Sequence, residues 1–63
     1  MIDYNQFMTV MHQRIAEGQR RGQAAFNTLF QFDPDRANEI RGTRLDPFNE
    51  DDLVDGFLSA VFS

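Results

Sequence analysis

Side chains that could act as nucleophiles, acids, bases or metal ligands are few and widely spaced in this sequence. His12 is the one histidine, cysteine is absent, and the serines are Ser59 and Ser63. Catalysis requires a reactive group with a second group that activates or orients it. A zinc site requires several thiolate or imidazole ligands. We therefore expect no enzyme activity, no catalytic residues, no cofactor and no metal, and we expect His12 to be a solvated surface residue.

Carboxylates are concentrated in residues 46–55, here called the acidic segment, which contains no basic residue. Its members are Asp46, Glu50, Asp51, Asp52 and Asp55. The spacing does not match a calcium-binding loop, because Phe48 occupies a ligand position and the central glycine is missing. Carboxylates in the first turn of a helix are favoured by the helix dipole. Two hypotheses remain: a helix-capping role, or a negative surface that meets a basic partner or mimics nucleic-acid phosphates.

Arginine supplies every positive side chain. The chain has six arginines, no lysine and a net charge of −4, and all the arginines precede residue 46. Arg14, Arg20 and Arg21 could form a basic patch, but three arginines are few for nucleic-acid binding, which the net charge also opposes. We expect no direct nucleic-acid binding. We expect these arginines to pair with the acidic segment, within the molecule or across a homodimer.

The hydrophobic pattern predicts an all-α fold, a single domain over residues 1–63. A domain of 63 residues buries only about 60% of the surface that its unfolded chain exposes, so it needs efficient packing, self-association or both. Apolar residues recur at helical spacing in four stretches, which predicts a compact bundle of three to four helices. The predicted ranges are about 3–17, 20–31, 34–41 and 49–62.

Capping signals set the ends of these helices. Asp3 followed by Gln6 forms a capping box, and Ile2 with Phe7 forms a hydrophobic staple. Asp33-Pro34 starts the third helix. Gly18 and Gly42 are expected to end the first and third helices. A connector runs from Thr43 to Pro47, and Leu45 and Phe48 are expected to enter the core from this loop.

The last helix is apolar around most of its circumference. Its apolar residues are Leu53, Val54, Phe57, Leu58, Ala60, Val61 and Phe62. One apolar face normally satisfies a core, so the wider arc indicates core packing on two sides or a second contact with a partner or another copy. The candidate partner-binding residues are the anchors Phe57, Leu58, Val61 and Phe62 and the acids Glu50, Asp51, Asp52 and Asp55.

Residues 22–48 resemble a family of small proteins from bacteriophage and prophage genomes. The matching residues are Gly22-Gln23, Phe26-Asn27, Leu29, Pro34-Asp35, Ala37, Ile40-Arg41-Gly42-Thr43 and Asp46-Pro47-Phe48. Members tend to carry an aromatic residue where this chain has Asn49. The family has no assigned biochemical activity, so the resemblance implies a phage origin. The motif has two interpretations: a structural turn, in which Asn27 satisfies backbone groups, or a shared binding loop.

These observations predict a phage-encoded protein-binding module that modulates a host protein by occupancy, for example in counter-defence or host takeover. One alternative is an acidic nucleic-acid mimic that blocks a DNA- or RNA-binding host protein, and another is a self-associating structural phage protein. The first residues lack the basic and apolar parts of a signal peptide, and no apolar run reaches the ~20 residues that span a bilayer. We therefore expect a location in the host cytoplasm, with no membrane contact.

Overall fold

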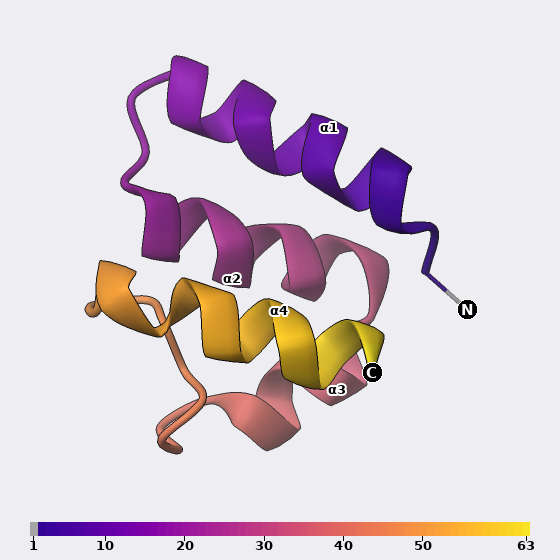
Figure 1. Cartoon of the computed structure of the whole chain (residues 1–63), viewed down its shortest axis with the longest axis vertical. Coiled ribbons are helices and arrows are strands. Elements are labelled where there is room, and N and C mark those ends of the chain that lie inside the picture. Colours follow the sequence, from indigo (N-terminus) through magenta and orange to yellow (C-terminus); the bar gives the residue numbers. More distant parts are fainter. Residues whose placement is uncertain (1) are drawn as a thin grey trace.

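Helices make up most of the chain in the computed structural model, which describes residues 2–63 (Figure 1). The elements are α1 (Tyr4–Ala16), α2 (Arg21–Phe32), α3 (Pro34–Ile40), the short 3₁₀ helix η1 (Asp51–Leu53) and α4 (Val54–Phe62). The predicted all-α bundle is confirmed. The last helix differs from its predicted range because residues 51–53 form the tighter 3₁₀ turn and the α-helix begins only at Val54. No helix among residues 2–63 is long and apolar enough to cross a membrane.

The predicted capping residues account for the ends of α1 and α3. An Asp3 carboxylate oxygen accepts the Gln6 N–H at 2.9 Å, and Asp33 accepts the Arg36 N–H at 3.1 Å. These bonds satisfy backbone donors that have no partner in the first helical turn. Gly18 follows α1 with φ 109°, and Gly42 follows α3 with φ 77°. Both are left-handed conformations that favour glycine, and they turn the chain out of each helix.

Helix α2 lies in the middle of the bundle, between α1 on one side and α3 with α4 on the other (Figure 1). Each of the four α-helices contributes buried apolar side chains to one core. Its members are Phe7, Met11, Ala24, Ala25, Phe26, Leu29, Ala37, Ile40, Val54 and Phe57. Two buried positions on α2, Ala24 and Ala25, are alanine, so neighbouring helices approach its backbone closely while phenylalanines fill the larger spaces.

The connector packs differently from the sequence-based expectation. Leu45 is 40% exposed, so its predicted insertion into the core is wrong. Pro47 is fully buried in its place, and Phe48 packs partly buried against the core. The close approach of Pro47 to α2 is possible because Gly22 has no side chain: a Cβ there would overlap the Pro47 carbonyl oxygen. The absence of a side chain at Gly22 therefore allows the connector to pack against α2.

The acidic segment is bound to the start of α2, which lacks a side-chain cap of its own. Asp51 accepts the Gly22 N–H at 3.0 Å from a site 29 residues away in sequence. Arg21 pairs with Asp55 at 3.0 Å, and Arg20 donates to the Phe48 carbonyl oxygen at 3.1 Å. The predicted pairing with a carboxylate of the acidic segment thus occurs within one molecule for Arg21 alone, since Arg20 contacts a backbone carbonyl and Arg14 donates to Gln31 at 2.6 Å. Because Asp51 also meets the positive end of the α2 dipole, it caps a helix other than the one that it precedes.

Candidate functional site

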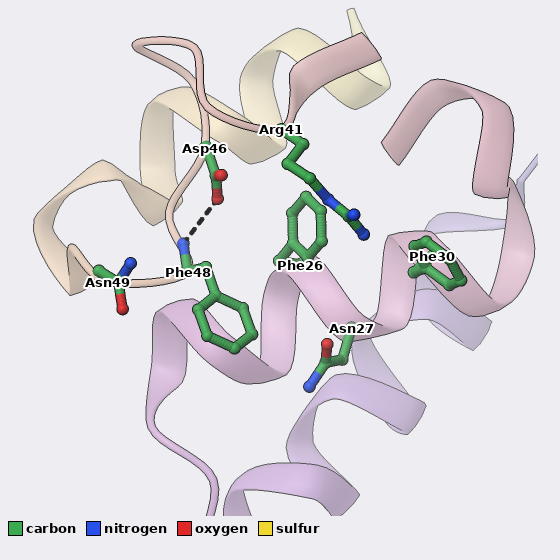
Figure 2. A pocket seen from close by; sticks show the side chains of 7 residues that line it. All are labelled: Phe26, Asn27, Phe30, Arg41, Asp46, Phe48 and Asn49. Carbon is green, nitrogen blue, oxygen red and sulfur yellow. Dashed lines mark hydrogen bonds between the residues drawn. The ribbon is translucent and has the colours of Figure 1, made fainter. Parts of the chain in front are cut away.

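An open hollow of about 390 Å³ lies between α2, the end of α3 and the connector (Figure 2). We call it the aromatic hollow, because three phenylalanines supply most of its apolar surface. Its lining residues are Phe26, Asn27, Phe30, Arg41, Asp46, Phe48 and Asn49. Residues from three separate stretches of sequence therefore meet at this one place.

Helical spacing and the connector place the three rings. Phe26 and Phe30 are four residues apart on α2, so their side chains lie on the same face of that helix. Phe48 reaches the hollow from the connector, and its ring meets Phe26 edge to face, with centroids 6.0 Å apart. Phe26 is almost fully buried, whereas Phe30 is 40% exposed. The hollow thus has a fixed aromatic floor and a more exposed aromatic side.

Arg41 directly follows α3, and its side chain projects over the rings (Figure 2). The carbon at the centre of its guanidinium lies 5.6 Å from the Phe26 ring centroid and 5.5 Å from that of Phe30. Both distances fall in the range of cation–π attraction. The one ion pair among residues 2–63 joins Arg21 to Asp55, so Arg41 has no carboxylate partner there. Aromatic contacts, rather than an acid, orient this cation.

Asp46 lines the same hollow, but its carboxylate is used by the connector. One oxygen accepts the Gly42 N–H at 2.8 Å, and the other accepts the Phe48 N–H at 2.9 Å. These bonds hold the turn that carries Phe48 into the hollow. Asn27, predicted to satisfy this turn, donates instead to Gln19 at 3.2 Å. Asp46 is therefore the residue that shapes the connector.

Replacing Asp46 by alanine is expected to lower the free energy of unfolding by about 1–2 kcal/mol, because two backbone donors lose a charged acceptor. Asp52→Ala is the matched control, since Asp52 is exposed and makes no side-chain hydrogen bond among residues 2–63. Its effect should stay within about 0.5 kcal/mol. Urea denaturation followed by circular dichroism measures both. Equal effects of the two variants would show that the Asp46 bonds do not stabilise the turn.

The predicted apolar anchors on α4 are divided between core and surface. Phe57 has an exposed fraction of 0%, so its assignment as a partner-binding anchor is wrong: the side chain packs inside the bundle. Leu58, Val61 and Phe62 pack against the core and are only partly buried. The Phe62 ring meets Tyr4 at 5.0 Å and Phe7 at 5.2 Å, both edge to face. Core packing on two sides therefore accounts for much of the wide apolar arc.

The acidic candidates are divided in a similar way. Asp51 and Asp55 are occupied by Gly22 and Arg21. Glu50 and Asp52 are exposed and make no side-chain hydrogen bond or ion pair among residues 2–63. No group of three histidine or carboxylate side chains in this part of the chain is placed to hold a metal ion. The capping role was predicted for the last helix, but neither η1 nor α4 has a side-chain capping bond, and Asp51 caps α2 instead.

The aromatic hollow was not predicted as a site from the sequence, although most of its lining residues were named there. Five lining residues belong to the resemblance pattern, namely Phe26, Asn27, Arg41, Asp46 and Phe48. The shared binding loop, one of the two interpretations of that pattern, was the available signal. Comparisons of the chain with protein-family models, with curated proteins and with solved structures found no match.

Proposed function

We propose that this chain is a small protein-binding module that acts by occupying a surface of its partner, and that the aromatic hollow is its contact site. The supporting observation is the combination of three phenylalanines and one arginine around an open hollow. Aromatic residues and arginine are enriched in protein interfaces, and tyrosine, tryptophan and arginine dominate their binding energy. Energetically important anchors also cluster in a well-packed centre, as the edge-to-face pair of Phe26 and Phe48 does here.

The shape of the hollow favours a protein segment over an enclosed small molecule. Small-ligand sites usually bury most of the ligand and offer several convergent polar groups. In this hollow, the carboxylate of Asp46 and the side-chain amide of Asn27 are already engaged within the chain. Arg41 is the cation that is left for an incoming ligand, and beside it the exposed amide of Asn49 makes no side-chain hydrogen bond among residues 2–63. A hollow with one cation and exposed rings fits a side chain projecting from a larger partner.

The resemblance to phage proteins supports a partner in the bacterial host and an encounter in its cytoplasm. A chain that carries no catalytic pair modulates such a partner by blocking or bridging surfaces, which requires only binding. We include in this proposal that the chain is not an enzyme. The binding surface then decides the biological effect, because it decides which partner surface becomes inaccessible.

Phe30→Ala tests the proposal, since it removes an exposed ring of the hollow without emptying the core. The wild-type chain, immobilised and exposed to a bacterial lysate, is expected to retain a protein that the Phe30→Ala chain retains at least about tenfold less, as measured by quantitative mass spectrometry. The matched control is Leu45→Ala. Leu45 is also 40% exposed, lies in the connector and does not line the hollow.

Retention by Leu45→Ala should equal that of the wild type. The proposal is contradicted if no protein is retained above the blank, or if both variants retain every captured protein equally. Circular dichroism of each variant shows that the helical fold is kept, so loss of capture is not loss of structure.

A further inference from the structure

We propose that the aromatic hollow recognises a short peptide segment in which one carboxylate stands beside an apolar or aromatic side chain. This inference rests on the proposed function and specifies the partner's chemistry. The carboxylate would pair with Arg41, and the apolar side chain would lie against Phe30 and Phe48. Arg41 is then a specificity-determining residue rather than a structural one.

The Arg41 guanidinium is oriented in the free chain before any ligand binds. Its position over Phe26 and Phe30 is set by ring contacts, and no carboxylate among residues 2–63 pairs with it. A guanidinium presents five N–H donors in a planar fork that matches the two oxygens of a carboxylate. The contacts with the two rings restrain the guanidinium group before the ligand arrives. Less conformational freedom is then lost when a carboxylate binds.

Burial of the Arg41 cation by a partner would require an anion beside it. Arg41 is exposed in the free chain, so water solvates it. A partner that covered the hollow with apolar groups alone would remove that water and leave a desolvated charge, which is strongly unfavourable. Asp46 does not pair with Arg41, and its two oxygens are directed to backbone donors of the connector. The partner must therefore bring its own anion.

The arrangement of the three rings determines where the apolar part of the ligand would lie. Phe48 and Phe30 lie on either side of Phe26, and the guanidinium lies between Phe26 and Phe30 (Figure 2). An apolar side chain in the hollow would meet ring edges and faces, which aromatic and aliphatic groups pack against well. The anion and the apolar group must then be close neighbours in the ligand, one or two residues apart in a peptide.

Charge distinguishes this ligand from a nucleic acid, which also offers anions and flat rings. Arg41 is the one cation that lines the hollow, and the chain carries a net charge of −4. A polynucleotide brings one phosphate per nucleotide, and affinity for it depends on neutralising several of them. A single carboxylate requires one cation only. The electrostatics therefore favour an acidic peptide segment.

Selection from a displayed library of random twelve-residue peptides tests the proposal directly. On the wild-type chain, we expect enrichment of sequences with aspartate or glutamate within two residues of an aromatic or large aliphatic residue. Enrichment should disappear on Arg41→Gln and Phe30→Ala chains and persist on Arg44→Gln. Arg44 is the matched control, because it is an exposed arginine of the connector that does not line the hollow.

A double-mutant cycle on one selected peptide then tests the pairing. Changing its acid to the amide should raise the Kd about tenfold on the wild-type chain and have almost no further effect on Arg41→Gln. Arg41→Lys should also weaken binding severalfold, because lysine keeps the charge but loses the stacked planar fork. Circular dichroism of Arg41→Gln checks that its fold is retained.

In the peptide selection, no enrichment above the blank or enrichment of peptides without an acid would overturn this inference. An acid effect that persists on Arg41→Gln would overturn it as well. So would Arg41-dependent binding of a single-stranded oligonucleotide. Concentration-dependent dimerisation that is lost in Arg41→Gln would also overturn it, by identifying a second copy as the occupant. Any of these outcomes can occur while lysate capture still depends on Phe30. The chemistry of the ligand and the protein-binding function can therefore fail separately.

Discussion

Phe57→Ala is expected to lower the free energy of unfolding by about 3–5 kcal/mol, the usual cost of truncating a large buried aromatic residue. Phe57 has an exposed fraction of 0% and lies in the core shared by the helices. A domain of 63 residues has a total stability of roughly 3–9 kcal/mol. The variant should therefore be substantially unfolded at or slightly above room temperature. Urea or thermal denaturation followed by circular dichroism measures the loss.

Phe30→Ala is the control with the same chemical change on the surface. Its ring is 40% exposed, so the expected loss is about 1 kcal/mol. The two variants thus separate the core from the binding surface. A Phe57→Ala chain that kept its stability and lost partner binding would show that Phe57 is an interface anchor, as its place in the apolar arc had suggested.

Gly22→Ala is expected to destabilise the fold by about 2–3 kcal/mol through overpacking, although alanine is normally the better helix former. The added Cβ would overlap the Pro47 carbonyl oxygen and lie 3.0 Å from the Asp51 carboxylate. Pro47 is fully buried, so the connector cannot retreat without disturbing the core. Displacement of Pro47 also moves the adjacent Phe48, so partner capture should fall together with stability.

Gly56→Ala is the matched control on α4. A Cβ at Gly56 has no neighbouring atom within 4 Å, and Gly56 has no positive φ. This substitution should stabilise the chain by about 0.5 kcal/mol through the better helix propensity of alanine. The test is that the two substitutions change the free energy of unfolding in opposite directions, as measured by urea denaturation. A neutral or stabilising Gly22→Ala would contradict the close contact between α2 and the connector.

Local signals in the sequence were sufficient for the helices. Asp3, Asp33, Gly18 and Gly42 each act within three or four residues of their own position, so their roles can be recognised without the fold. The same holds for Phe7, because its place in the helical pattern and in the predicted staple indicates a side chain inside the bundle, where it is fully buried. These elements were predicted correctly because the forces that form them operate over one helical turn.

Long-range contacts account for what the sequence did not reveal. The capping of α2 by Asp51 joins residues 29 positions apart, and no local pattern indicates it. Leu45 is exposed and Pro47 is buried, because the connector is held by Asp46 and by the space at Gly22 rather than by hydrophobicity alone. The aromatic hollow likewise depends on three segments meeting, which periodicity within a single helix cannot show.

The dissociation constant of the captured partner tests the central claim that the aromatic hollow is the binding surface. It should be measured for the wild-type chain, for Phe30→Ala in the hollow and for Val61→Ala on the partly exposed side of α4. We predict that Phe30→Ala raises the Kd about tenfold or more, whereas Val61→Ala changes it by less than about twofold. The opposite ranking would contradict the account and place the interface on α4.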